Sequence, residues 1–238
     1  LFVVHITHNA MGKVSEWLEI IDDANDAGAN IATETLSYAA GGTSISADVF
    51  RNRDWQGMFD ITHEDVQWVA TGEWLTEETW NKYAREQPGG AVNHHYVKED
   101  WIETALKWPR MMVATDALPA VDLRVKTNPN VAGTFSRVLG HYVRDTGLLT
   151  LSDGLARMSL YQAQWLSQSS SSFDKKGRIQ LGADADIVIF DPIKVQANAA
   201  YGDPYQPPSG IPYVVVAGQI VVKNSVVVAG VYPGKRIL

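Results

Sequence analysis

The segment from Met111 to Asp116 constrains the fold more than any other, because a short apolar run ends there in a solitary carboxylate. The run lies between Pro109 and Pro119, and an apolar run without alternation is typical of a strand buried on both faces of a parallel sheet. Asp116 follows the run, and α/β barrels place their chemistry at the carboxyl ends of their strands. Two interpretations stay open: Asp116 is a catalytic acid, or it caps a turn, as Asp commonly does.

The chain alternates strands and helices over its first 170 residues. Amphipathic spacing predicts the helices, and apolar runs bounded by Gly or Pro predict the strands. The predicted parallel strands are Leu1–His5, within a run that reaches His8, Ile31–Thr35, Ala91–His94 and Met111–Thr115; the helices are Val14–Ala27, Lys98–Leu106, Thr134–Arg144 and Ser152–Leu166. Four such units predict half of an eight-stranded (β/α)8 barrel, whose open edges need further strands.

An insertion from about 51 to 87 interrupts this alternation. It holds Trp55, Trp68, Trp74 and Trp80 among charged residues, and Thr76 begins a helix-start pattern with acids in the first turn. A long insertion of this kind either covers a substrate site or packs its tryptophans into a small core of its own.

The last sixty residues favour β-structure. After the polar stretch Ser167–Lys176, predicted strands lie at Ile187–Phe190, Tyr213–Val216, Ile220–Val222 and Val226–Val228. We therefore predict an α/β chain with two domains, the barrel half over 1–176 and a small β-sandwich over 177–238.

Composition excludes several classes of function. The formal net charge of −7 argues against a nucleic-acid-binding surface, and the absence of cysteine removes disulfide and thiolate chemistry from this chain. The longest apolar stretch, Ile211–Val222, is interrupted by Pro212 and Gly218 and is too short for a membrane helix. A small-molecule partner and a cytoplasmic location are therefore expected.

Two segments resemble a known family. The segment GTFSRVLGHYVRDTGLL, from Gly133 to Leu149, and the segment from Gly177 to Pro192 resemble the amidohydrolase superfamily, in particular its N-acyl-D-amino-acid deacylase, or D-aminoacylase, branch. Thr115-Asp116 resembles the end of the last barrel strand of that superfamily. The resemblance implies a metal-dependent hydrolase with a TIM-type barrel, and it assigns this chain to the C-terminal portion.

The same resemblance suggests a metal site. It implies a divalent metal, zinc by preference, with Asp116 as both ligand and proton shuttle and with His8, in Ile6-Thr7-His8, as the strand-five ligand. His5 is expected to face away from His8 and the metal site, because side chains alternate along a strand, and it is therefore assigned to packing. No histidine occurs in Asn30–Tyr38, where a further ligand would be expected, so Glu34 and His95 are candidates to complete the set. Two other interpretations of Glu34 stay open: it accepts a hydrogen bond behind the ligands, or it is a buried partner for an arginine.

The substrate contacts are predicted from the loops. The branch carries a His-Pro-Arg element, whereas this chain has Asn128-Pro129-Asn130, so a carboxylate-binding arginine is absent there. Arg124 and Lys126 are candidates to replace it, because cationic side chains bind carboxylates. The further candidates are Tyr38, in the region of a Tyr-Pro-Tyr motif of the branch, and His94, at a predicted strand end.

The expected function is removal of the acyl group from an N-acyl-D-amino acid. Two alternatives stay open: a cyclic-amide hydrolase or deaminase of the same superfamily, and a metal-free relative with a structural or regulatory role. Because the chain begins directly with the core-like strand at Leu1, we expect an upstream polypeptide to complete the barrel. No nucleic acid and no membrane partner is expected, and self-association into a homo-oligomer stays open.

Overall fold

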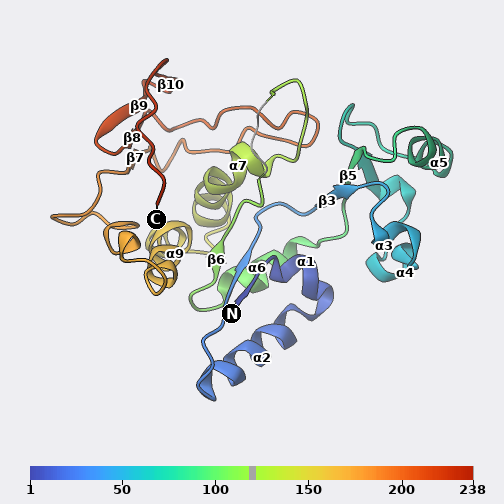
Figure 1. Ribbon diagram of the computed structural model, residues 1–238, viewed down its shortest axis with the longest axis horizontal. Coiled ribbons are helices and arrows are strands. Elements are labelled where there is room, and N and C mark those ends of the chain that lie inside the picture. Colours follow the sequence, from blue (N-terminus) through green and yellow to red (C-terminus); the bar gives the residue numbers. More distant parts are fainter. Residues whose placement is uncertain (118–121, 238) are drawn as a thin grey trace.

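Three short parallel strands lie at the centre of the fold (Figure 1). The computed structural model describes residues 1–117 and 122–237, so that Pro119 lies outside the described residues. β1 (Phe2–Val3) pairs with β2 (Ala32–Thr35), and β2 pairs with β6 (Met112–Val113). The sheet order is β1-β2-β6, and the parallel arrangement brings the three carboxyl ends to one edge. Three of the four predicted parallel strands are thereby confirmed.

The helices beside this sheet follow the amphipathic spacing of the sequence. α2 (Val14–Asp26) buries Val14, Leu18 and Ile21, and Gly28 follows it with a φ of 96°. That conformation is strained for residues with a side chain, and it fits a helix stop. α1 (Ile6–Ala10), η1 (Met11–Lys13) and α6 (Glu99–Lys107) lie nearby. The shared apolar cluster of α1, α2 and α6 contains Ile6, Ala10, Val14, Leu18, Ile21, Ala105 and Met111.

The first strand is shorter than predicted, and the extended run does not continue to His8. β1 ends at Val3, and His5 adopts the left-handed conformation, with φ 53° and ψ 48°. A left-handed residue cannot continue an extended strand, and α1 begins at the next residue. His8 therefore lies on a helix, where the two-residue alternation of strands does not apply.

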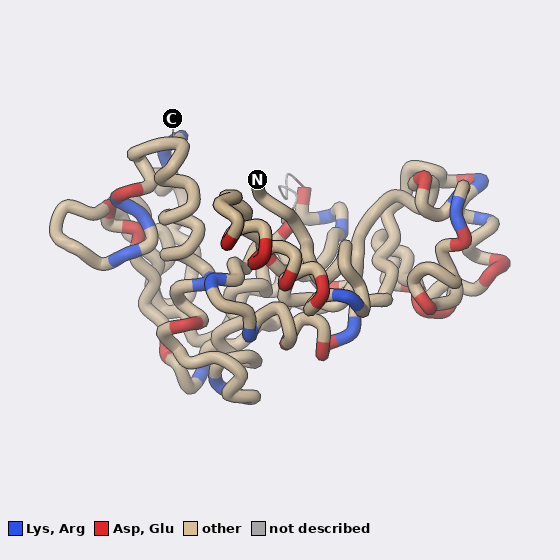
Figure 2. The backbone as a smooth tube through the Cα atoms, turned by 90° about the horizontal axis from the view of Figure 1, so that it is seen from below, with Lys and Arg blue, Asp and Glu red and all other residues tan. Residues whose placement is uncertain are grey.

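The segment between β2 and β6 in the sequence forms a separate lobe to one side of the central sheet (Figures 1 and 2). Its antiparallel sheet has the order β3-β5-β4, formed by β3 (Gly41–Ser44), β4 (Val66–Trp68) and β5 (Ala91–His94). The prediction of Ala91–His94 as a barrel strand is thus wrong, because lobe strands occupy both of its edges. The helices of the lobe are α3 (Asp48–Arg51), α4 (Trp55–Phe59), η2 (His63–Asp65) and α5 (Glu77–Glu86).

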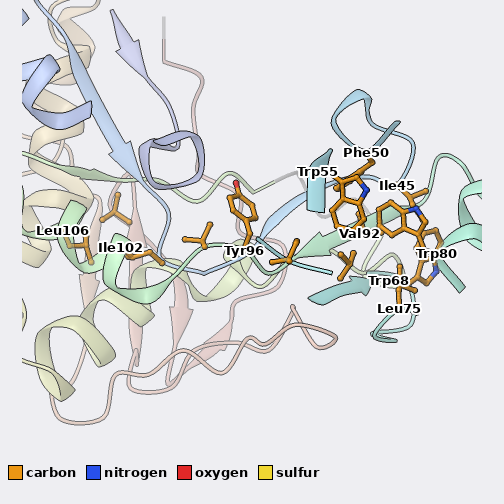
Figure 3. Close-up of a cluster of buried hydrophobic side chains, with 14 of the residues drawn as sticks. Ile45, Phe50, Trp55, Trp68, Leu75, Trp80, Val92, Tyr96, Ile102 and Leu106 are labelled. Atoms are coloured by element: carbon orange, nitrogen blue, oxygen red, sulfur yellow. The ribbon is translucent and has the colours of Figure 1, made fainter. Parts of the chain in front are cut away.

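Aromatic side chains form the core of this lobe, as Figure 3 shows. Trp55 and Trp80 stack with ring centroids 5.0 Å apart, and Phe50 meets both rings edge to face. Such pairs add about 0.5–1.5 kcal/mol to the gain from burial. The cluster continues through Tyr96 to Ile102 of α6, so that one apolar core joins the lobe to the central region.

Helices connect β6 to the C-terminal sheet. The predicted helix 134–144 is part of a longer unit, in which α7 (Asn130–Arg137) continues as the π-helix η3 (Val138–Asp145). The predicted helix 152–166 is confirmed as a continuous helical unit, and a 3-10 turn occurs inside the predicted polar loop. These elements are α8 (Leu151–Leu155), η4 (Ala156–Leu160), α9 (Tyr161–Leu166) and η5 (Ser171–Lys175).

Four antiparallel strands form the C-terminal sheet. Its order is β10-β9-β8-β7, and all four strands lie within two residues of their predicted bounds. Positive φ angles at Ala217 and Asn224 form the two tight turns that join the last three strands. The strands are β7 (Ile187–Ile189), β8 (Tyr213–Val216), β9 (Gln219–Lys223) and β10 (Val226–Val227).

The chain is therefore a mixed α/β protein in three regions. Figure 2 shows acidic and basic residues interspersed along the backbone of all three. No described helix is both long and apolar enough to cross a bilayer.

Replacement of Gly90 tests the packing of the lobe. A Cβ atom at Gly90 would overlap Cη2 of the buried Trp68 ring, whereas a Cβ atom at Gly89 would have nothing within 4 Å. We expect Gly90→Ala to lower the free energy of unfolding by about 1–3 kcal/mol, because overpacking forces rings and backbone to shift. Urea unfolding of the native protein measures this, with Gly89→Ala as the matched control. Equal stability of the two variants would contradict the close approach of Gly90 to the Trp68 ring.

Candidate functional site

Three polar side chains meet at the carboxyl edge of the parallel sheet. His5 follows β1, Glu34 lies near the end of β2, and Asp116 follows β6. His5 Nδ1 lies 2.7 Å from Glu34 Oε1, and His5 Nε2 lies 3.4 Å from Asp116 Oδ1. The imidazole therefore bridges two carboxylates that come from strands far apart in the chain.

Glu34 anchors this arrangement. Its side chain is 2% exposed, and Oε1 accepts the backbone N–H of His5 at 2.7 Å. A buried carboxylate needs such partners, since an unpaired buried charge is strongly unfavourable. Glu34 Oε2 has no hydrogen-bond partner among the described residues, so this oxygen keeps its capacity to accept.

The expectation that His5 faces away from the site is wrong. Its left-handed backbone follows the end of β1, and the carboxylates of Glu34 and Asp116 flank its ring. The interaction with Glu34 raises the pKa of His5 above its ordinary value, with a smaller contribution from Asp116, while burial opposes the shift. The imidazole is thus held between two acids at the end of a strand.

Asp116 occupies the position at which the sequence predicts it, after the buried strand. Its φ of 48° turns the chain away from the strand direction, and its side chain is 51% exposed. This carboxylate lines a cavity of ≈ 540 Å³, a size within the usual range for small-molecule sites. Lobe strands β3 and β5 form one wall, and the loop 122–128 forms another. Asp116 therefore combines a partner in the protein with access to a pocket.

His8 has different surroundings. Its ring is buried, with Nδ1 3.1 Å from Thr7 Oγ1 and Nε2 3.3 Å from the carbonyl oxygen of Ala40. Tyr96 packs edge to face against it. Burial lowers the pKa of His8 to about 4, so the ring is neutral at pH 7. The structure gives His8 contacts to hydroxyl, carbonyl and aromatic groups, and its role as a ligand stays a prediction.

His94 and His95 lie in the lobe. His94 stacks on Tyr96 and meets Phe50, while His95 packs against Trp74 and Tyr201. Burial lowers the pKa of each imidazole to about 4. Neither side chain lines the cavity beside Asp116, so these two roles stay predictions without geometric support.

Tyr38 belongs to a polar network behind the site. Its hydroxyl donates to the carbonyl oxygen of Ala199, and the Arg137 guanidinium lies 5.3 Å from its ring centroid. Arg137 donates to the carbonyl oxygen of Ser37 and to the carboxylate of Glu99. This network fixes the segment that follows Glu34, and it gives Tyr38 a positioning contact; substrate contact by Tyr38 stays a prediction.

The two predicted cations after Asp116 differ in their positions. The Arg124 side chain is 91% exposed, and its guanidinium donates to both oxygens of Asp122. Lys126 lines the cavity, as does Asp122. The geometry therefore supports Lys126 as a substrate contact, whereas Arg124 stays a prediction without such support.

Sequence reasoning misses two kinds of residue. The alternation rule assigns His5 to packing, because its neighbours Val4 and Ile6 give no signal of a left-handed turn. Asn93 and Asn128 also line the cavity. A signal for Asn128 is present, since it stands where the resembled branch carries His-Pro-Arg, but nothing local singles out Asn93.

The donor atoms present fit part of a metal site. Tetrahedral zinc with bonds of about 2.0–2.1 Å holds two donors about 3.3 Å apart, and His5 Nε2 and Asp116 Oδ1 are 3.4 Å apart. In residues 1–117 and 122–237, however, no three His, Asp or Glu side chains form a group that could hold a metal ion. A complete site needs donors beyond these.

Comparisons with known proteins agree with this architecture. The model of the amidohydrolase family matches residues 7–222. D-aminoacylase from Alcaligenes xylosoxydans xylosoxydans is 30% identical over 87% of this chain and 42% of its own length. N-acyl-D-glutamate deacylase from the same organism is 29% identical over 87% of this chain and 41% of its own length.

A solved structure shows the same fold. N-acyl-D-glutamate deacylase from Bordetella bronchiseptica, complexed with zinc and a phosphonate inhibitor that mimics the tetrahedral intermediate, has a TM-score of 0.76. Its sequence is 27% identical, and the match covers 92% of this chain and 46% of that one. The chain thus spans less than half of the length of these relatives. Because the family model covers most of its residues, the chain belongs to the amidohydrolase family.

Proposed function

We propose that the protein containing this chain hydrolyses the amide bond of an N-acyl-D-amino acid with the help of a divalent metal. The observation that carries the proposal is the bridge from Glu34 through His5 to Asp116, at the carboxyl edge of a parallel sheet and beside a cavity. Catalytic groups occupy this edge in barrel enzymes. The deacylase relatives support the choice of amide substrate.

Asp116 is the residue that moves the proton. Its half-exposed carboxylate can accept a proton from water as the amide carbonyl is attacked, and it can then deliver that proton to the leaving amine. His5 holds Asp116 Oδ1 in position, and Glu34 holds His5 through both its ring and its backbone N–H. Each carboxylate thus has a separate task, with Glu34 buried as the anchor and Asp116 open to the substrate.

His5 and Asp116 would hold the metal, with zinc as the preferred ion, as in the Bordetella deacylase complex. A divalent metal at these donors supplies Lewis acidity, which polarises the amide carbonyl and acidifies water. Glu34 orients His5 as a carboxylate behind a ligating imidazole commonly does. The resemblance assigns the ligand role to His8 instead, and the two assignments can be separated by experiment.

For the fold, we propose that the chain supplies the C-terminal half of a TIM-type barrel over 1–176 and part of a small β-sandwich over 177–238. β1 and β6 each pair with one neighbour among the described residues, so each keeps an open edge. The C-terminal sheet likewise exposes apolar side chains such as Val188 and Val227. An upstream polypeptide of similar size would cover these edges and supply the remaining metal ligands.

Removal of the Asp116 carboxylate tests its role. We expect Asp116→Asn to lower kcat by about 10²–10⁴-fold, the usual contribution of a general acid–base group, while the unfolding transition stays unchanged. Steady-state deacylation and urea unfolding measure the two effects. The matched control is Asp23→Asn on exposed α2, and turnover of the Asp116 variant within twofold of the wild type would refute the role.

His5 and His8 can be distinguished by metal content. We expect His5→Asn to lose bound zinc and activity, because His5 is the imidazole near Asp116. We expect His8→Asn to retain zinc and to lose about 1–3 kcal/mol of stability, since its ring is buried against Thr7 and Ala40. Elemental analysis of the purified proteins gives the readout. Loss of zinc from the His8 variant alone would assign the ligand role to His8.

The chain expressed alone should not be an active, independently stable enzyme. Open sheet edges and exposed apolar strand faces favour aggregation, and two metal donors are too few for tight binding. We expect heterogeneous assemblies in gel filtration and no deacylation, with both corrected by co-expression of the upstream polypeptide. A monodisperse monomer that unfolds cooperatively and has full deacylase activity would show this expectation to be wrong.

A further inference from the structure

The cavity beside Asp116 contains two carboxamides that the proposed reaction does not use. Asn93 lies on β5 and is 2% exposed, and Asn128 lies in the loop after Asp116. A methyl group built on Gly42 of β3 would lie 3.5 Å from Asn93 Oδ1 and 3.6 Å from Asn128 Nδ2. The two carboxamides therefore flank one point of the cavity wall, and the missing side chain of Gly42 keeps the space between them open.

The two carboxamides present complementary atoms at this point. Asn93 Oδ1, which accepts hydrogen bonds, and Asn128 Nδ2, which donates them, face the position of the missing Gly42 side chain. A carboxamide ligand can donate to Asn93 Oδ1 and accept from Asn128 Nδ2, so it matches both atoms. A carboxylate ligand cannot do so, because an ionised carboxylate only accepts hydrogen bonds.

The charges around the cavity also disfavour an acidic side chain on the substrate. Lys126 is the one cationic side chain among the described residues that line it, whereas Asp122 and Asp116 are both anionic. The Arg124 guanidinium is engaged by both oxygens of Asp122, so its planar fork is not free for a ligand. One lysine can pair with the α-carboxylate that every N-acyl amino acid carries. A second carboxylate would have no further unpaired cation among the described residues that line the cavity.

The loop that carries these groups is held in place. Tyr205, which also lines the cavity, donates its hydroxyl to the carbonyl oxygen of Val125 at 2.6 Å. Asp122 accepts the backbone N–H of Arg124 at 2.9 Å, which closes the turn on the other side of Val125. Lys126 and Asn128 therefore follow a closed turn that Tyr205 holds from outside the loop, and such support is what a recognition loop requires.

We propose, on the basis of the proposed function, that Asn93 and Asn128 determine specificity for a substrate side chain that is neutral and carries a hydrogen-bond donor, with a carboxamide as the best match. Acidic side chains are disfavoured, because a carboxylate offers no donor to Asn93 Oδ1. Apolar side chains are accepted less well, because they leave both Asn93 Oδ1 and Asn128 Nδ2 without a partner from the ligand.

Isosteric substrates test this preference in the native protein loaded with zinc. N-acetyl-D-glutamine and N-acetyl-D-glutamate differ only in the terminal group, and N-acetyl-D-leucine supplies the apolar comparison. We expect kcat/KM for the glutamine substrate to exceed that for the glutamate substrate by about 10- to 100-fold, the factor that one or two hydrogen bonds confer. The leucine substrate should fall between the two.

Two variants identify the residues responsible. Asn128→Ala should lower kcat/KM for the glutamine substrate about tenfold and leave the leucine substrate within twofold. Gly42→Ala should also lower kcat/KM for the glutamine substrate, because its methyl group would fill the space between the two carboxamides. The fold should be undisturbed, since that methyl group meets both carboxamides at ordinary contact distances. The control is Asn81→Ala, on the exposed face of α5 in the lobe.

The outcomes separate the inference from the function on which it rests. Equal or better hydrolysis of the glutamate or leucine substrate overturns the specificity and leaves the deacylase function standing. An unchanged preference in both variants overturns the assignment to Asn93 and Asn128. Failure to hydrolyse any of the three amides refutes the proposed function itself.

Discussion

The buried carboxylate of Glu34 is the group on which the geometry of the site depends. It lies on the central strand of the parallel sheet, where desolvation would be costly without partners, and His5 supplies both its backbone N–H and its ring. These contacts support His5 in the left-handed conformation that ends the first strand. The Nε2 atom of the ring thereby faces Asp116, which follows β6. One buried acid on β2 thus positions groups that follow both neighbouring strands.

Local patterns predict the parts of the fold that local physics decides. The buried strand before Asp116, the helix from Val14 and the C-terminal strands follow from apolar spacing and turn residues, and all are present. The partners of a strand are a long-range property: Ala91–His94 reads equally well as a barrel strand, and only the adjacent β3 and β4 place it in the lobe. The position of His5 is not predictable for the same reason, because its conformation depends on an acid 29 residues away.

The lobe also shows that the two interpretations of the insertion are not exclusive. Its tryptophans fill a core of their own, which satisfies the packing interpretation. The same core holds β3 and β5, and those strands form a wall of the cavity beside Asp116. Because the core continues through Tyr96 into α6, the wall is joined by packing to the central region that carries His5, Glu34 and Asp116 (Figure 3).

In the proposed function this arrangement separates chemistry from recognition. His5, Glu34 and Asp116 lie at the edge of the parallel sheet, while Asn93 and Gly42 belong to the lobe and Asn128 to the loop after β6. Substitutions on the lobe wall can change which side chain fits without altering the Glu34–His5–Asp116 bridge. Under the proposed function, specificity for the amino acid is therefore a property of the lobe and the loop facing it, and the hydrolytic step is a property of the sheet.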